Sequence, residues 1–326
     1  MFSLNLDKQS DTRSQLVENK YSEQVQAAVA EVSQALLGKE HQIRLALCCL
    51  FSGGHLLVED LPGMGKTTLS YALARALGLD YNRVQFTSDL LPADILGISI
   101  FDQNSGQFSF HPGPIFNQVV LADEINRSTP KTQSALLEAM EERQVTVEGE
   151  TRKLPEPFFV IATQNPVNLA GTYPLPESQL DRFLMRLRLG YPDQRAEREL
   201  LEMDTEWDKV ENVKQCLQVD DVTEFRRQSA TITASGSLLD YVQRLIAFTR
   251  GKDEFHFGLS PRGSLALMRA AKTWALMCGR NHVIPEDVQA ILPSVVEHRL
   301  RAVSDEDGHT GASLVQRMLS EVDILE

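Results

Sequence analysis

Cysteine is scarce in this sequence. The 326 residues include four cysteines, Cys48, Cys49, Cys216 and Cys278, and their spacing matches neither a metal-binding nor a redox motif. A cysteine-ligated metal centre and a redox-active cysteine pair are therefore not expected. Reduced thiols with a structural role in the cytosol are the prediction.

Long apolar runs are lacking as well. The most apolar stretch, IRLALCCLF at residues 43–51, is too short to cross a bilayer. The first twenty residues contain no apolar stretch of the kind that a secretory signal requires. The sequence therefore predicts a soluble cytoplasmic protein without a membrane span.

Positive charge is in deficit. Lysine and arginine number 32 against 45 acidic residues, which gives a formal net charge of −13. This balance argues against bulk attraction to DNA or to anionic membranes. A hydrophobic content of 42% is ordinary for a soluble globular protein, and the length suggests two or three domains.

Four short apolar runs in the first half have the character of buried strands. They are HLLVE, NRVQFT, QVVLADE and FFVIATQN, and helical patterns such as KTTLSYALARALG separate them. Strands that alternate with helices predict an α/β fold with a parallel sheet wound with helices. An amphipathic helix with Val25, Val29, Val32 and Leu36 at helical spacing is predicted before them, with Gly38 as its stop.

Two segments interrupt this alternation, and both predict a β-hairpin insert. GISIFDQNSGQFSFHPGP alternates apolar and polar residues around a turn at 104–106, and RQVTVEGETRKLPEPF turns near Glu148-Gly149. Beyond residue 192 the strands are predicted to stop and amphipathic helices to follow. The predicted organisation is a flexible segment at 1–20, an α/β domain at 21–191 and a helical lid domain at 192–326.

The stretch EDLPGMGKTT, residues 59–68, lies between a predicted strand and a predicted helix. It nearly matches the phosphate-binding pattern G-x-x-x-x-G-K-[ST], with Asp60 in place of the first glycine. In such a loop the backbone N–H groups surround a phosphate, and Gly63 and Gly65 allow the close approach. Lys66 would contact the β- and γ-phosphates, and the Thr67 hydroxyl would face Mg²⁺. Alone, the motif indicates a nucleotide and does not separate kinases, GTPases and motors.

Two further predicted strands end in polar side chains. Asp123 and Glu124 follow VVLA, and Asn165 follows FFVIATQ. Because ligands bind at the carboxyl ends of parallel strands, these groups are expected to meet the phosphate loop. Asp123 would hold Mg²⁺ and Glu124 would orient the attacking water, whereas Asn165 would contact the γ-phosphate. A solvated strand end and an Asn-Pro turn are the alternatives.

Two arginines complete the candidate site. Arg182 in ESQLDRFL precedes the predicted domain boundary, and Arg262 in LSPRGSLAL lies in the first turn of a lid helix. A guanidinium assists phosphoryl transfer at the γ-phosphate and often comes from a neighbouring chain. A surface salt bridge is the alternative for either residue.

From about Gly38 onward the chain resembles the MoxR family of AAA+ ATPases. The resemblance is densest over GPIFNQVVLADEINRSTPKTQSALLEAMEERQVTVEGE and ATQNPVNLAGTYPLPESQLDRF. It implies a P-loop core of the AAA+ type, in which many members carry an acid at the Asp60 position. It also implies that Walker A falls on Gly63, Gly65, Lys66 and Thr67, Walker B on Asp123 and Glu124, sensor 1 on Asn165, the arginine finger on Arg182, and sensor 2 on Arg262.

The resemblance further implies a site, an assembly and a role. ATP would contact Pro62, Gly63, Met64, Gly65, Lys66, Thr67, Thr68 and Asp123, Mg²⁺ would be held by Thr67 and Asp123, and Glu124, Asn165, Arg182 and Arg262 would act in catalysis. The expected assembly is a homo-oligomeric ring, a hexamer, with ATP between subunits. Family members are chaperone-like remodellers of client proteins, often paired with a protein that bears a von Willebrand factor A-type domain.

Three alternatives remain open at this stage. A nucleic-acid motor is disfavoured by the acidic charge, although Arg152 and Lys153 form a small basic spot on the second hairpin. A scaffold that nucleotide locks, with little turnover, is the second. A GTPase or small-molecule kinase is the third, but no Asn-Lys-x-Asp guanine signature occurs in the core.

Overall fold

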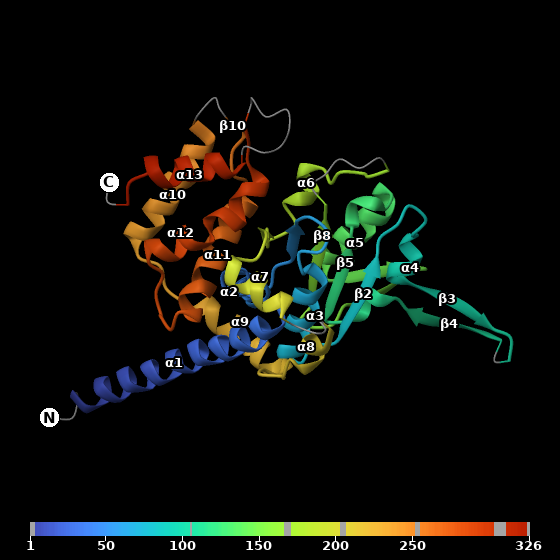
Figure 1. The fold of residues 1–326 in the computed structure, drawn as a ribbon, viewed down its shortest axis with the longest axis horizontal. Coiled ribbons are helices and arrows are strands. Elements are labelled where there is room, and N and C mark those ends of the chain that lie inside the picture. Colours follow the sequence, from blue (N-terminus) through green and yellow to red (C-terminus); the bar gives the residue numbers. More distant parts are fainter. Residues whose placement is uncertain are drawn as a thin grey trace.

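The four predicted strands, with one more, pair in a single parallel sheet of order β2-β5-β8-β1-β9 (Figure 1). The computed structural model describes residues 4–104, 106–165, 171–202, 207–251, 255–302 and 311–324. The strands are β1 Leu56–Glu59, β2 Tyr81–Gln85, β5 Val119–Asp123, β8 Phe159–Gln164 and β9 Met185–Leu187. The α/β prediction is confirmed, and β9 is the strand of this sheet that was not predicted.

The central strands are apolar throughout because both faces of the sheet are covered. Along β5, Val119 and Leu121 belong to one buried cluster, whereas Val120 and Ala122 belong to another. The first cluster continues into α3 through Leu69, and the second continues into α5. Alternate side chains of one strand thus reach two cores, which is why these strands show continuous apolar runs instead of a period of two.

The helices of the first part of the chain cover the sheet and connect its strands. They are α1 Leu4–Ala35, α2 Glu40–Phe51, α3 Lys66–Ala76, α4 Pro92–Leu96, η1 Pro114–Phe116, η2 Ile125–Arg127, α5 Pro130–Glu142 and α6 Glu177–Leu180. Helix α1 differs from the expected flexible segment at residues 1–20, because it begins at Leu4. No glycine or proline occurs before Gly38, so no residue of the segment interrupts the helix.

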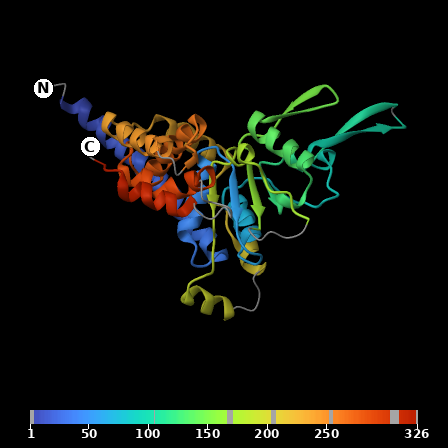
Figure 2. The same cartoon turned by 90° about the horizontal axis from the view of Figure 1, so that it is seen from above.

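Both predicted hairpins are present. Strands β3 Gly97–Asp102 and β4 Gln107–Pro112 form the first, and β6 Gln144–Val147 and β7 Glu150–Lys153 form the second. Of the expected first turn, residue 105 lies outside the described residues. Figure 2 shows both hairpins projecting from the side of the α/β core that faces away from the lid. The first exposes apolar side chains, and Phe108 is 72% exposed.

The second hairpin turns through two residues in the left-handed region. Glu148 has φ 54° and Gly149 has φ 84°. Positive φ at both central residues is the conformation that tight two-residue hairpin loops favour.

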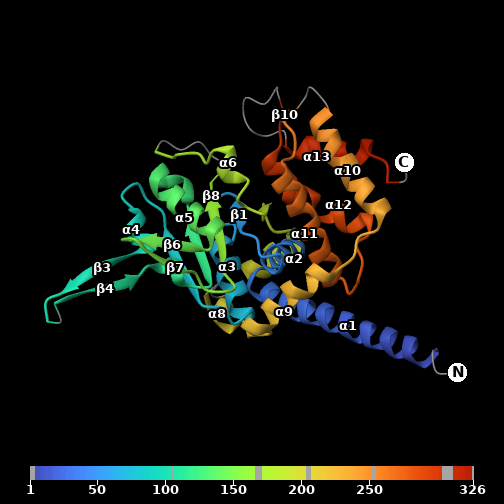
Figure 3. The same cartoon turned by 180° about the vertical axis from the view of Figure 1, so that it is seen from behind.

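The chain beyond residue 192 is largely helical, as predicted. It comprises α7 Gln194–Leu201, α8 Trp207–Asn212, α9 Val219–Thr231, α10 Gly236–Gly251, β10 Phe255–Phe257, α11 Pro261–Met277, α12 Pro285–Val296, η3 Glu297–Arg299, β11 Arg301–Ala302 and α13 Gly311–Glu321 (Figure 3). The prediction that strands stop here is wrong, because β10 and β11 form an antiparallel pair. Strands of three and two residues are too short to leave a periodic pattern.

The lid and the N-terminal helices share one hydrophobic core. Phe51 of α2 stacks on Phe225 of α9 with ring centroids 4.2 Å apart, and Tyr21 of α1 meets the same ring edge-on at 5.2 Å. The lid therefore packs on α1 and α2 as well as on the sheet. Among the helices of the described residues, none combines the length and apolarity that a bilayer crossing requires.

Candidate active site

The loop of residues 60–65 connects the end of β1 to the start of α3. Gly63 and Gly65 have φ of 82° and 83°, a region that side chains disfavour. A Cβ atom on Gly65 would also lie 2.6 Å from Leu36 Cδ1 of the chain preceding the sheet. Helix α3 begins at Lys66, so the N–H groups of its first turn face the loop and are available to a phosphate.

Lys66 is buried at the mouth of this loop, with 8% of its surface exposed. Its Nζ donates to Asn165 Oδ1 at 2.9 Å, to Leu61 O at 3.3 Å and to the carbonyl oxygen of Asp60. Burial lowers the pKa of Lys66, and the nearby Asp60, Asp123 and Glu124 carboxylates oppose that shift. The lysine thus already lies beside the amide that ends β8.

Asp60, at the position where the general pattern has glycine, does not have a positive φ. Its Oδ1 accepts the Leu61 N–H at 2.9 Å, and its Oδ2 accepts the Gly190 N–H at 2.6 Å. Lys39 Nζ donates to the carbonyl oxygen of Tyr191, the residue after Gly190, at 2.6 Å. The acidic side chain therefore attaches the entrance of the loop to the segment that leads from β9 into the lid.

Asp123 ends β5 and is 8% exposed. Its Oδ1 accepts the Thr163 hydroxyl at 2.6 Å, and its Oδ2 accepts Arg83 Nη2 at 2.6 Å. Thr163 is fully buried in β8 and Arg83 lies on β2, so both neighbouring strands hold this carboxylate.

Glu124 follows in a strained backbone conformation. Its φ is 56°, which is uncommon for a residue other than glycine. Residues in such backbone conformations cluster at functional sites. Its N–H donates to Thr163 Oγ1 at 2.8 Å. Its carboxylate accepts Asn165 Nδ2 at 3.2 Å, Gln85 Nε2 at 3.1 Å and Arg127 Nε at 3.0 Å. The contacts from β2 and β8 fix where the carboxylate points.

The structure thus brings together the predicted groups from three strand ends. Lys66 contacts Asn165, Asn165 contacts Glu124, and Thr163 connects Glu124 to Asp123. The sequence reading missed Thr163, Gln85, Arg83 and Arg127. Thr163 left a signal, a polar residue inside an apolar run, whereas the other three become significant only through the pairing of strands.

The group also fits a divalent cation bound together with phosphates. Among the described residues no cluster of three or more His, Cys, Asp or Glu side chains could hold a metal alone. One carboxylate, that of Asp123, and one hydroxyl, that of Thr67 in the first turn of α3, suit Mg²⁺, which keeps most of its other ligands from water and phosphate.

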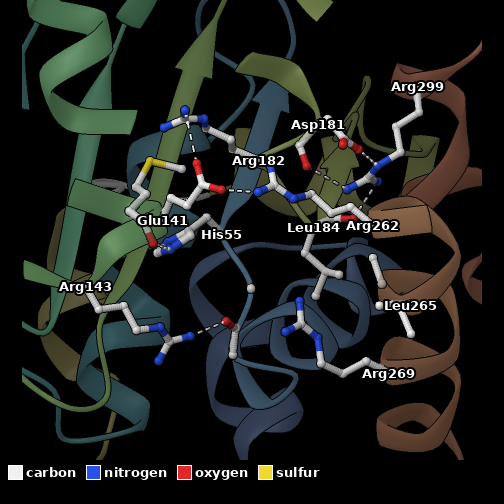
Figure 4. Close-up of a pocket in the computed structure, with 14 residues that line it drawn as sticks. His55, Glu141, Arg143, Asp181, Arg182, Leu184, Arg262, Leu265, Arg269 and Arg299 are labelled. Atoms are coloured by element: carbon white, nitrogen blue, oxygen red, sulfur yellow. Dashed lines mark hydrogen bonds and ion pairs between the residues drawn. The ribbon is translucent and has the colours of Figure 1, made fainter. Parts of the chain in front are cut away.

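Arg182 and Arg262 lie elsewhere, at the amino-terminal edge of the sheet. Leu184 N donates to His55 O at 2.8 Å, just before β1 begins, whereas Lys66 follows the end of that strand. Arg182 Nη1 donates to Leu137 O at 2.7 Å, and its Nη2 pairs with Glu141 at 3.0 Å near the end of α5. Arg262 of the lid pairs with the same carboxylate, as Figure 4 shows.

A cavity of about 750 Å³ lies beside the two arginines. Its lining includes His55, Glu141, Arg143, Arg182, Arg262 and Arg269, drawn from the core and from α11 (Figure 4). The excess of guanidinium groups over carboxylates would suit an anionic group. The predicted catalytic residues therefore fall into two groups, one at each edge of the sheet.

Comparisons with known proteins agree with this arrangement. Residues 55–185 match the family model described as "ATPase family associated with various cellular activities (AAA)", and residues 247–318 match an AAA lid domain. The protein YeaC of Bacillus subtilis is 44% identical over 299 residues, which cover 91% of this chain and 93% of the relative. Chaperone MoxR1 of Mycobacterium tuberculosis is 40% identical over 286 residues, which cover 85% and 75%.

The chain belongs to the MoxR family of AAA+ ATPases. A crystal structure of a protein from Cytophaga hutchinsonii, described provisionally as an ATPase, superposes with a TM-score of 0.85. It is 34% identical and covers 98% of this chain and all of its own. This MoxR-family protein is accordingly an ATPase with an AAA+ core and a helical lid.

Proposed function

We propose that this protein hydrolyses ATP with Mg²⁺ at the interfaces of a homo-oligomeric ring, a hexamer, and uses the cycle to remodel client proteins. Binding would rest on residues 62–68. The backbone N–H groups of the loop and the first turn of α3 would surround the phosphates, and Lys66, which is buried, would add a positive charge. The Mg²⁺ ion, held by Thr67 and Asp123, would neutralise developing charge on the phosphates.

Hydrolysis would rest on Glu124 and Asn165. The Glu124 carboxylate is directed by contacts from β2 and β8 toward the amide of Asn165, which also contacts Lys66. A carboxylate in that place can orient the attacking water and accept its proton, and the amide can hold the water or the γ-phosphate. Movement of Gln85 and Asn165 off the carboxylate would accompany entry of the substrate.

The observation that carries the interface proposal is the position of the two arginines. Both lie at the edge of the sheet that is opposite the phosphate loop, so neither is placed to serve the nucleotide bound by its own chain. A neighbouring subunit could present its nucleotide at the cavity beside them. On this basis we assign Arg182, and with it Arg262, to action on the neighbour's ATP. For Arg182 the assignment keeps the role expected from the sequence. For Arg262 the sequence left open whether it acts on the nucleotide of its own chain or of the neighbour, and we propose the neighbour.

The remodelling role has support in the exposed hairpin of β3 and β4. Phe101, Phe108, Ile98 and Ile100 are between 46% and 72% exposed on a ribbon that extends away from the core (Figure 3). Contiguous exposed apolar surface is typical of interaction sites. A relative is named as a chaperone, and we extend that activity to this chain. A client with a von Willebrand factor A-type domain remains the proposal that the family resemblance suggests.

A role on nucleic acid has less support. The basic spot of the second hairpin is used within the protein, since Arg152 pairs with Glu150 and lies over the Phe110 ring at 4.0 Å. These contacts of Arg152 attach the second hairpin to the first and leave the exposed Lys153 as the other cation of the spot.

The test compares two substitutions. Lys66→Ala should abolish ATP binding, because the loop loses its only side-chain cation. Glu124→Gln should bind ATP with wild-type affinity and lose turnover, since the amide cannot accept the water's proton. Equilibrium binding of a fluorescent ATP analogue and steady-state phosphate release measure the two properties. Substantial turnover by Glu124→Gln would overturn the catalytic assignment and favour a different base.

A further inference from the structure

Arg299, at the end of the lid's η3, is a buried cation in which every N–H group is used. Its side chain is 4% exposed, although it carries a full positive charge. A guanidinium has five N–H donors. Nε donates to Asp181 Oδ1 at 2.6 Å, Nη1 to Leu184 O at 3.1 Å and to Val295 O, and Nη2 to Asp181 O at 3.2 Å and Phe183 O at 2.6 Å.

Four of these five bonds go to one short segment, and that segment carries Arg182. The acceptors belong to Asp181, Phe183 and Leu184, so they flank Arg182 on both sides. His298, the preceding residue, adds a bond from Nε2 to Phe183 O at 3.1 Å. The backbone on either side of Arg182 is therefore held by two consecutive residues of the lid, while the Arg182 side chain extends toward α5 (Figure 4).

The lid contacts this segment from a second element as well. Ser260, which caps α11, donates its hydroxyl to Asp181 Oδ2 at 3.2 Å. Two residues later, Arg262 shares the Glu141 carboxylate with Arg182. A displacement of the lid would thus change the position of the Arg182 backbone and, at the same time, the ion pair that holds its side chain.

We infer that Arg299 is a positioning residue for Arg182, through which the lid of one subunit sets the reach of its arginine toward the neighbour's ATP. The inference rests on the proposed interface function. The physical reason is that a planar guanidinium with all donors bound holds five acceptor oxygens, four of them in residues 181–184, in one geometry, which a flexible ammonium cannot do. A change in the lid position of one subunit, set by its nucleotide state, would therefore change the rate of hydrolysis at the site of the next subunit.

The first test uses Arg299→Lys, with Asp181→Asn as a second variant that removes the charge pair and keeps the backbone acceptors. Each should lower kcat, for Arg299→Lys by about 10²-fold, because a displacement of about 1 Å at a catalytic group can cost that much. The affinity for ATP should not change, since the variant's own phosphate loop is intact. Arg280→Lys is the matched control, because Arg280 pairs with the buried Asp287 inside the lid and does not contact residues 181–184.

The second test separates positioning from general damage by complementation. Arg299→Lys subunits are mixed with Lys66→Ala subunits, which bind no ATP but present an intact Arg182. The mixture should hydrolyse ATP faster than either variant alone. A parallel mixture of Arg182→Ala with Lys66→Ala reports whether arginines act between subunits at all.

The outcomes are distinguishable. Recovery in both mixtures supports the inference. Recovery with Arg182→Ala but not with Arg299→Lys overturns the inference and leaves the interface function standing. Recovery in neither mixture overturns the interface function, and the inference with it. Wild-type kcat in Arg299→Lys, or an equal loss in Arg280→Lys, also overturns the inference.

Discussion

At the scale of single residues, Asp60 shows how the phosphate loop tolerates a side chain where glycine is usual. Its two carboxylate oxygens accept the N–H groups of Leu61 and Gly190, so it connects the loop entrance to the chain that leaves β9. The residue is 9% exposed, and neither N–H would find water easily without it. The acid at this position is thus a structural element of the loop in this protein.

Asp60→Asn should therefore destabilise the protein. An amide offers one acceptor and places an NH₂ group against a second N–H, which leaves a buried donor unsatisfied at a cost of about 1–3 kcal/mol. Urea unfolding with and without ATP would measure the loss. Asp80→Asn, at an exposed position, is the control and should change the free energy of unfolding little. An Asp60→Asn variant as stable as Asp80→Asn would show that the Gly190 contact is dispensable.

The residues that we propose for the phosphate chemistry could be identified from sequence because each has a distinctive type next to a recognisable strand. Lys66, Asp123 and Asn165 are of this kind, and the structure places them within one hydrogen-bonded group. Gln85 and Arg299 could not be proposed in this way. The Glu124 partner of Gln85 lies 39 residues away and the partners of Arg299 in residues 181–184 lie more than 110 residues away, so only the folded chain brings them together.

At the scale of elements, the strands were predictable wherever burial on both faces produced an apolar run of four or more residues. Strand β9 was missed because MRL, with an arginine in its centre, looks like the continuation of a loop. That arginine, Arg186, pairs with Glu59 and Glu297 at the edge of the sheet. Helix α1 was predicted too short because helical spacing of apolar residues is clear only in its second half, which packs on the core.

Buried His55 holds three of these elements together and should make stability depend on pH. The residue lies just before β1, its Nε2–H donates to Met140 O of α5 at 3.2 Å, and its Nδ1 accepts the Val160 N–H of β8 at 3.0 Å. Burial lowers its pKa to about 3, and Arg143, Arg226 and Arg269 add to the shift. Burial also lowers the pKa of His298 well below its usual value.

Because the unfolded histidine has a pKa near 6.5, the unfolded state binds more protons between about pH 3 and 6.5. The stabilisation is complete above the unfolded pKa and is lost as the pH falls, by at most about 1.4 kcal/mol per pH unit for each histidine. Urea unfolding at pH 7, 6, 5 and 4 measures the slope. His55→Gln should reduce it by about one proton, whereas His282→Gln, at an exposed position, should not. Equal slopes for the two variants would contradict the assignment to His55.

At the scale of the whole molecule, the sheet separates the two groups of predicted site residues. The phosphate loop and the acidic pair lie at the carboxyl edge, and Arg182 with Arg262 lies at the opposite edge beside the cavity. The sequence identified both groups but not their separation, because the spacing of residues along a chain does not say which edge of a sheet they reach. Closure of a ring would place the carboxyl edge of one subunit against the arginines of the next.

Hydrolysis should accordingly depend on assembly and on Arg182 of the neighbour. Arg182→Ala should lower turnover by roughly 10³-fold, the range for a guanidinium that stabilises transferring phosphate. Added to wild-type protein, a Lys66→Ala/Arg182→Ala double variant should inhibit it, because a wild-type subunit beside this variant loses its guanidinium and the variant has no phosphate loop that could gain one. Phosphate release is measured across mixing ratios at fixed total protein. Arg195→Ala, which removes an exposed lid arginine, is the control and should leave activity proportional to total protein. Activity in the double-variant mixtures that equals the wild-type fraction, and does not fall below it, would mean that each chain completes its own site. Turnover per subunit that stays constant on dilution to the monomer would lead to the same conclusion.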